Sequence, residues 1–132
     1  MSLPEQATFT GHVNAKVLRI ADDDSRLVAY EVTFAPEART HWHSHPHGQL
    51  LLVTSGAARI QLEGHPVAEI DAGDSLWIPP AARHWHGAAP AGPMTHIAMQ
   101  EAAADGSTVV WSGPVSDTAY NDNRPTPSKG AP

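Results

Sequence analysis

Cysteine is absent from the 132 residues, which excludes disulfides and thiolate metal ligands. Basic residues are few: eight Lys and Arg stand against 14 Asp and Glu, and they are scattered along a chain with a formal net charge of −6. A basic patch that binds nucleic acid is therefore not expected. Long hydrophobic runs are also missing, since stretches such as "QLLLV" are far too short to cross a bilayer. These absences predict no nucleic-acid partner and no membrane partner.

The two ends of the chain carry little apolar character. The N-terminal stretch "MSLPEQATFTG" lacks the basic segment and apolar stretch of a secretory signal, so a cytoplasmic location is expected. Residues 121–132, "NDNRPTPSKGAP", have no apolar residue beyond Ala and Pro. They predict a flexible tail behind a single domain of residues 1–120.

No long segment shows the apolar period of a helix, and Gly or Pro interrupts the chain at short intervals. Short runs with strand character take its place. They cover residues 27–34, 49–56, 57–64, 65–70, 74–80 and 94–100, with a hairpin expected around Gly64. In the last run, alternation places Met94, His96, Ala98 and Gln100 on one face. The pattern predicts an all-β sandwich or barrel.

Histidine is unusually frequent: nine residues, more than Lys and Arg combined. Residues 39–49, "RTHWHSHPHGQ", place His41, His43, His45 and His47 at every second position. Alternate residues of a strand point to the same side, so any His-x-His pair here is able to bind one metal ion.

Alternation alone does not choose between these histidines. The pair His43 and His45 is followed by Gln49, which opens an apolar run. A competing set uses His41, His43 and His47, although Pro46 interrupts a strand before His47 is reached. The pair His45 and His47 straddles that proline.

Two stretches are similar to the conserved motifs of the cupin superfamily. "HSHPHGQLLLVTSG" resembles the first motif, a His-x-His pair, an acid and a glycine, at His43, His45, Gln49 and Gly56. "GDSLWIPPAARH" resembles the second motif, with His84 at the position of its histidine. The resemblance runs from about residue 8 to residue 120. It implies a single-domain double-stranded β-helix, also called a jelly-roll barrel.

The same resemblance implies a divalent metal ion with His43, His45, Gln49 and His84 as ligands. His41 and His47 are then expected to be exposed or to lie at the lip of the barrel. Ligands of this type admit Mn, Fe, Ni, Co or Zn. Because Gln49 stands where the motif has a glutamate, the ion keeps its full double positive charge. A stronger Lewis acid and somewhat weaker metal binding are expected.

Three loop positions depart from the cupin motifs. Glu37 and Ala81 replace motif glycines, and Ala88 replaces an asparagine. These changes weaken the match of the pattern more than they weaken the metal site.

The strings "ARTHWHSHPHGQ", "HWHGAAP" and "MTH" resemble those of bacterial manganese-dependent cupin hydroxynitrile lyases. That resemblance implies manganese, His96 as general base, and Thr40 and Gln100 as pocket residues that hydrogen-bond a small-molecule substrate. The implied reaction is the reversible cleavage of a carbon–carbon bond in a small hydroxynitrile, assisted by a Lewis-acid metal.

Other functions remain open. A cupin dioxygenase or other oxidoreductase, an isomerase and a non-enzymatic ligand-binding protein all suit such a fold. His96 is also compatible with a supporting role that orients a metal ligand. No role is assigned to His86.

The N-terminal run "HVNAKVLRI", residues 12–20, is typical of a strand at the edge of a sheet. An unpaired edge is commonly covered by a second subunit. A homodimer or homotetramer is therefore expected, in line with the resemblance to small single-domain cupins.

Overall fold

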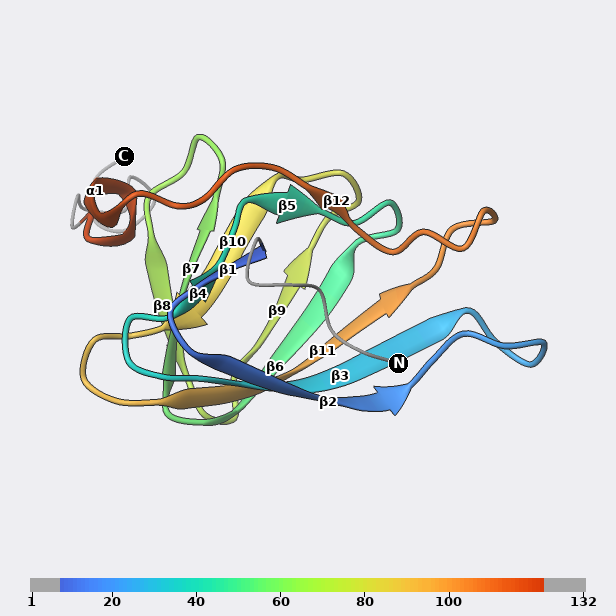
Figure 1. Cartoon of the computed structure of the whole chain (residues 1–132), viewed down its shortest axis with the longest axis horizontal. Coiled ribbons are helices and arrows are strands. Elements are labelled where there is room, and N and C mark those ends of the chain that lie inside the picture. The colour runs from blue at the N-terminus through green and yellow to red at the C-terminus, as the bar shows by residue number, and fades with distance from the viewer. Residues whose placement is uncertain (1–7, 123–132) are drawn as a thin grey trace.

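The computed structural model describes residues 8–122, which form two antiparallel sheets that face each other and curl into a barrel (Figure 1). One sheet has the strand order β2 (Val13–Arg19), β3 (Leu27–Phe34), β11 (Met94–Glu101), β6 (Gln49–Ser55) and β9 (Ser75–Ile78). The other contains β1 (Phe9–Thr10), β4 (Arg39–Thr40), β5 (His43–Ser44), β7 (Ala57–Leu62), β8 (Ala68–Asp71), β10 (His84–Ala88) and β12 (Val110–Trp111). A single helical turn, α1 (Asp117–Tyr120), follows β12. The expected all-β barrel is confirmed.

Two central strands carry the histidines of the C-terminal half into the barrel. In one sheet, β10 pairs with β7 and also with β4 and β5, and its register sets His84 opposite His43. In the other sheet, β11 pairs with β3 and β6. The expected alternation of β11 is confirmed, because Met94, His96, Ala98 and Gln100 are all buried.

Most of the expected strands are present with small changes at their ends. The run 49–56 forms β6 and closes at Gly56, whose φ of 77° suits a tight turn. The expected hairpin around Gly64 joins β7 to β8. A strand starting at residue 65 is wrong: β8 begins at Ala68, since the N–H of His65 closes a turn onto the carbonyl of Leu62 and Pro66 has no N–H to pair. The expected flexible tail falls almost wholly on residues 123–132, outside the described part of the chain.

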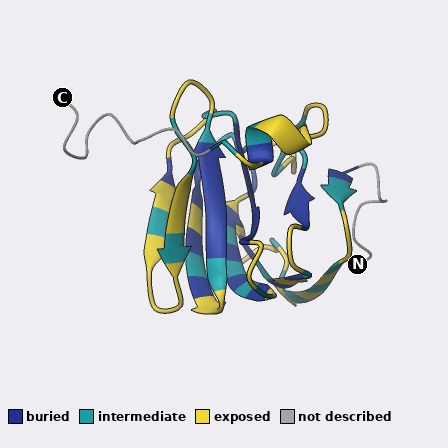
Figure 2. Ribbon diagram, turned by 90° about the vertical axis from the view of Figure 1, so that its left-hand side faces the viewer, coloured by how far each residue is buried: buried dark blue, intermediate teal, exposed yellow. Residues whose placement is uncertain are grey.

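The apolar core lies between the sheets. Figure 2 shows the buried residues concentrated in the central strands, whereas the turns, the outer strand β8 and the start of α1 are largely exposed. Phe34, Leu51, Ile78 and Met94 are fully buried in the core. A smaller cluster packs Trp85 against Val115 and Tyr120 of the C-terminal segment. The Tyr120 hydroxyl donates to the carbonyl of Ala88, which ties α1 to β10. The sequence did not predict α1, β1 or β12, because elements of two to four residues are too short to show a period.

Two departures from the cupin motifs have a backbone explanation. Glu37 and Ala81 have φ of 68° and 63°, and among the described residues they are the non-glycine positions with positive φ. Both side chains are exposed. At positions 37 and 81 the backbone therefore keeps the left-handed conformation for which the motif has glycine. Each of these residues bears the steric cost of a Cβ in that conformation.

This strain predicts that Ala81→Gly stabilises the protein. Removing the Cβ relieves the steric cost of the left-handed conformation, and the larger conformational entropy of glycine in the unfolded chain offsets part of this gain. The free energy of unfolding should rise by about 0.5–1 kcal/mol. Urea unfolding measures it. Gly64→Ala is the matched control, since Gly64 has φ of 85° and its Cβ would meet nothing within 4 Å. That variant should lose stability; an Ala81→Gly variant no more stable than the parent would contradict the strain.

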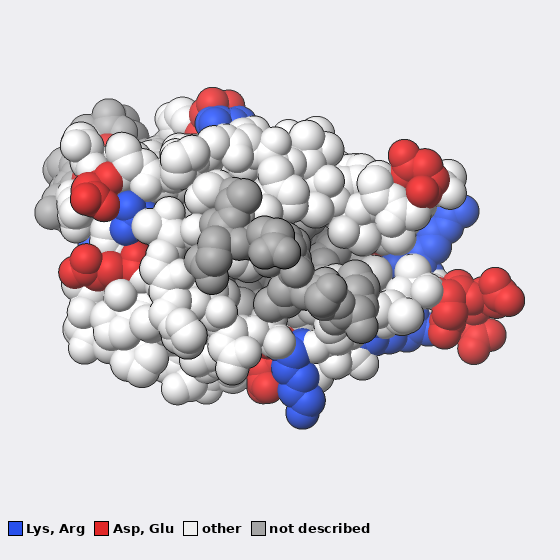
Figure 3. Space-filling model, viewed as in Figure 1, with Lys and Arg blue, Asp and Glu red and all other residues white. Residues whose placement is uncertain are grey.

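Charged side chains are dispersed over the face shown in Figure 3, where Lys and Arg lie apart and mostly near Asp or Glu. Contacts of this kind include Arg19 with Asp22 and Arg83 with Glu63, both at 2.9 Å. Across the described residues, no helix is both long enough and apolar enough to cross a membrane.

Candidate metal centre and active site

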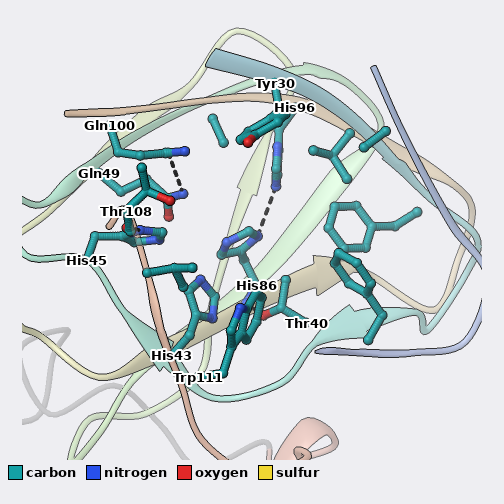
Figure 4. A pocket seen from close by; sticks show the side chains of 16 residues that line it. Tyr30, Thr40, His43, His45, Gln49, His86, His96, Gln100, Thr108 and Trp111 are labelled. Atoms are coloured by element: carbon teal, nitrogen blue, oxygen red, sulfur yellow. Dashed lines mark hydrogen bonds between the residues drawn. The ribbon is translucent and has the colours of Figure 1, made fainter. Parts of the chain in front are cut away.

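A cavity of about 230 Å³ lies between the sheets, with one polar end and one apolar wall (Figure 4). The polar end includes His43, His45, Gln49, His86, His96 and Gln100. The apolar wall includes Phe9, Val32, Phe34, Ala98, Val109 and Trp111. A small organic molecule with one reactive polar end fits this division.

Three histidines meet at the polar end with their ring nitrogens arranged in the same way. Nδ1 of His43, His45 and His84 lies 2.8, 2.6 and 2.9 Å from the backbone carbonyls of His41, Thr108 and Ala82. A carbonyl only accepts, so each Nδ1 must carry the proton, and each Nε2 keeps a free lone pair. The possible ligand atoms of the three residues lie within 4.8 Å of one another.

Gln49 adds an oxygen to this group from the start of β6. Its amide nitrogen donates to Oε1 of Gln100 at 3.1 Å, which turns its own Oε1 toward Nε2 of His84 at 3.2 Å. Because Nδ1 of neutral His84 holds the proton, Oε1 of Gln49 and Nε2 of His84 are both acceptors, and no hydrogen lies between them. The buried Nε2 of His45 has no hydrogen-bond partner in the protein.

Burial keeps the three imidazoles neutral. It lowers the pKa of His84 to about 4, lowers the pKa of His45, and lowers that of His43 well below its ordinary value with a contribution from the neighbouring histidines. A neutral imidazole is the form that binds metal. Four converging lone pairs without a proton, three from nitrogen and one from oxygen, fit a divalent cation.

The structure brings together all four residues that the sequence suggested as ligands. The competing sets are not assembled: His41 is half-buried outside the cluster, and His47 is exposed. His43 lies in β5, His45 directly follows it, and Gln49 and His84 open β6 and β10.

A second pair of buried histidines lies beside the cluster. Nε2 of His96 is 2.9 Å from Nδ1 of His86. Burial lowers the pKa of His96 to about 4, and burial together with the nearby histidines lowers the pKa of His86 well below its usual range. Both rings are therefore neutral at ordinary pH. The sequence proposed a role for His96 alone, although "HWH" places His86 on the same side of its strand as His84.

Two further pocket residues are oriented as donors. Oγ1 of Thr40 accepts the backbone N–H of His86 at 3.2 Å, so the Thr40 hydroxyl hydrogen is free to point elsewhere. Gln100 uses Oε1 to hold Gln49 and keeps its NH₂ group available. Both line the cavity, as the resemblance implied.

Part of the apolar wall comes from elements that the sequence did not reveal. The Trp111 ring of β12 is tilted over His43 with 4.8 Å between ring centroids, and Phe9 of β1 meets Trp111 edge-on at 6.2 Å. The aromatic residues at positions 9 and 111 were the available signal, but nothing in their surroundings predicted a strand.

The chain belongs to the cupin family, because the family model described as "Cupin domain" matches residues 30–99. Among characterised proteins it is similar to the (R)-mandelonitrile lyase of Granulicella tundricola, with 48% identity over 112 residues and 85% of each chain covered.

Solved structures agree with the fold. A cupin-like protein from Thermotoga maritima superposes with a TM-score of 0.80 and 39% identity, over 89% of this chain and 88% of that one. A conserved protein with a double-stranded β-helix domain from Klebsiella pneumoniae gives a TM-score of 0.64 and 21% identity, over 77% and 85% of the two chains.

Proposed function

We propose that this cupin is a metal-dependent lyase that cleaves and forms the carbon–carbon bond of a small hydroxynitrile. The observation that carries the proposal is the set of four lone pairs lying beside a neutral, buried histidine pair at the polar end of an apolar-walled cavity. The 48% identity to a mandelonitrile lyase supports the same reaction.

His43, His45, Gln49 and His84 would hold the metal ion, and we propose manganese. When bound, the ion supplies Lewis acidity, which stabilises negative charge that develops on the substrate. An amide oxygen in place of a carboxylate leaves that charge undiminished, which suits a reaction that releases an anion.

The residues of the chain supply the proton transfers. The hydroxyl proton of the substrate passes to the neutral His96 as the carbon–carbon bond breaks, which yields an aldehyde or ketone and cyanide, and the proton then leaves with cyanide as HCN. Thr40 and the Gln100 NH₂ group donate hydrogen bonds to substrate oxygen or nitrogen. The wall of Phe34, Val32 and Trp111 holds the organic side chain away from water.

The proposal is tested with purified protein supplied with Mn²⁺ and racemic mandelonitrile, followed by benzaldehyde absorbance and cyanide release. We expect both products in equal amounts and no oxygen uptake. A panel of aliphatic hydroxynitriles then defines the side chain that the pocket accepts. Oxygen consumption without cyanide release would favour a dioxygenase, and tight binding without turnover would favour a ligand-binding protein.

We also propose that the protein self-associates through the outer face of the β2–β9 sheet. β2 is an edge strand, and Trp77, Leu50 and Met99 lie side by side across β9, β6 and β11. The residue Trp77 is 54% exposed, which is unusual for a side chain of its size.

Light scattering at micromolar concentration should therefore give the mass of a homodimer or homotetramer. Trp77→Glu should shift that mass toward one chain, because it places a charge in the apolar face. Val110→Glu is the matched control, since Val110 is 61% exposed on the opposite sheet. A wild-type mass of one chain would contradict self-association.

A further inference from the structure

His86 lies between the metal-ligand cluster and His96. Its ring centroid is 5.2 Å from that of His43, and it stacks on His84 at 5.7 Å. Figure 4 shows the His86 ring with His96 on one side and the side chains of His43, His45 and Gln49 on the other. A substrate group held at the cluster therefore meets His86 before it meets His96.

The two nitrogens of His86 have different surroundings. Nδ1 bonds to Nε2 of His96 at 2.9 Å, whereas Nε2 is buried, has no hydrogen-bond partner and belongs to a ring that lines the cavity. A buried ring nitrogen with no partner in the protein is expected to meet a bound molecule.

Two arrangements of protons satisfy the contact between the rings, and one of them directs a lone pair of His86 into the cavity. Nδ1 of His96 is buried with no hydrogen-bond partner in the protein. With the His96 proton on that Nδ1, its Nε2 is an acceptor. The hydrogen between the two rings then belongs to Nδ1 of His86, and Nε2 of His86 presents a lone pair to the cavity.

We infer that His86 is a catalytic residue that passes the substrate proton to His96. This inference rests on the proposed lyase function. Two protons move in the step. The substrate O–H proton goes to Nε2 of His86, and the Nδ1 proton of His86 goes to Nε2 of His96. His86 ends neutral with its proton on the other nitrogen, and His96 carries the positive charge. In the reverse direction the same two transfers return the proton to the substrate oxygen.

The test separates transfer from simple support of His96. In His86→Asn the amide NH₂ takes the place of Nδ1–H, so it still donates to Nε2 of His96 and still orients that ring, but nothing replaces Nε2 of His86. Transfer through His86 predicts that kcat for mandelonitrile cleavage falls by about 10²–10⁴ while Mn content stays at the parent value. Activity within about threefold of the parent would show that His86 only positions His96 and would overturn the inference.

The double variant His86→Asn/His96→Ala provides a second readout. Two residues that act in series on one proton should give a double variant no slower than the slower single variant. Losses that multiply would mean that the two histidines act independently, which rejects the transfer.

A readout that does not depend on turnover distinguishes this inference from the lyase proposal. Nitrogen NMR of the Zn²⁺-loaded protein should find the proton of both His86 and His96 on Nδ1. A proton on Nε2 of His86 would overturn the inference whatever the reaction is. Absence of mandelonitrile cleavage by the wild-type protein would instead reject the lyase function.

Discussion

Replacing His84 and His96 by alanine should separate metal binding from catalysis. His84→Ala removes one of four converging lone pairs and should lose both the metal ion and the activity. His96→Ala removes a group whose ring hydrogen-bonds to His86 and to none of the four ligand side chains. It should keep the metal content of the parent and lose about 10²–10⁴ in turnover, the usual contribution of a positioned base.

Elemental analysis of the purified variants, paired with cyanide release, checks both halves of this prediction. His47→Ala is a suitable control, because His47 is exposed and lies outside the metal-ligand cluster. Activity of His96→Ala that returns on addition of excess Mn²⁺ would mean that His96 supports the metal and would reject its role as a base.

The protein should lose stability steeply between about pH 6.5 and pH 4. Burial lowers the pKa of His96 from its ordinary 6.5 to about 4, so the folded protein holds this ring neutral where the unfolded chain protonates it. The unfolded state then binds more protons in that window. The stability contributed by His96 is complete above pH 6.5, declines as the pH falls, and is lost below about pH 4. A shift of this size corresponds to on the order of 3 kcal/mol.

Urea unfolding at several pH values measures this effect. His96→Gln cannot protonate in the window, so its free energy of unfolding should depend less on pH, by up to about 1.4 kcal/mol per pH unit. His12→Gln, which changes an exposed histidine, is the matched control. Equal slopes for all three proteins would show that burial does not hold His96 neutral.

The metal-ligand set was predictable from the resemblance to the two cupin motifs. The histidines of residues 41–47 share the parity of one run, so alternation alone left the choice between them open. The positions of the motifs indicated His43, His45, Gln49 and His84. The sequence also placed His96 in the cavity, since the alternation of 94–100 is regular and β11 keeps its inward face despite a register shift beside Thr95.

The contacts that support the site were not predictable, because they join residues far apart in the sequence. Gln49 and Gln100 are 51 residues apart, and their hydrogen bond depends on the pairing of β6 with β11. The contact between His86 and His96 crosses from one sheet to the other, and no periodicity within either strand encodes it. Phe9 and Trp111 of the apolar wall lie in β1 and β12. These strands have two residues each and are too short to show a periodic pattern in the sequence.

His45 differs from the other two histidines of the cluster in what holds its ring. His43 and His84 donate to carbonyls two residues earlier in their own segments, whereas His45 donates to Thr108, 63 residues away in the loop between β11 and β12. The loop also contributes Thr108 and Val109 to the cavity lining. A bound ion would hold the His45 ring and, through its hydrogen bond, the carbonyl of Thr108. Metal affinity and the order of residues 102–109 are therefore expected to be linked, and linkage is reciprocal, so a substrate that orders this loop should also strengthen metal binding.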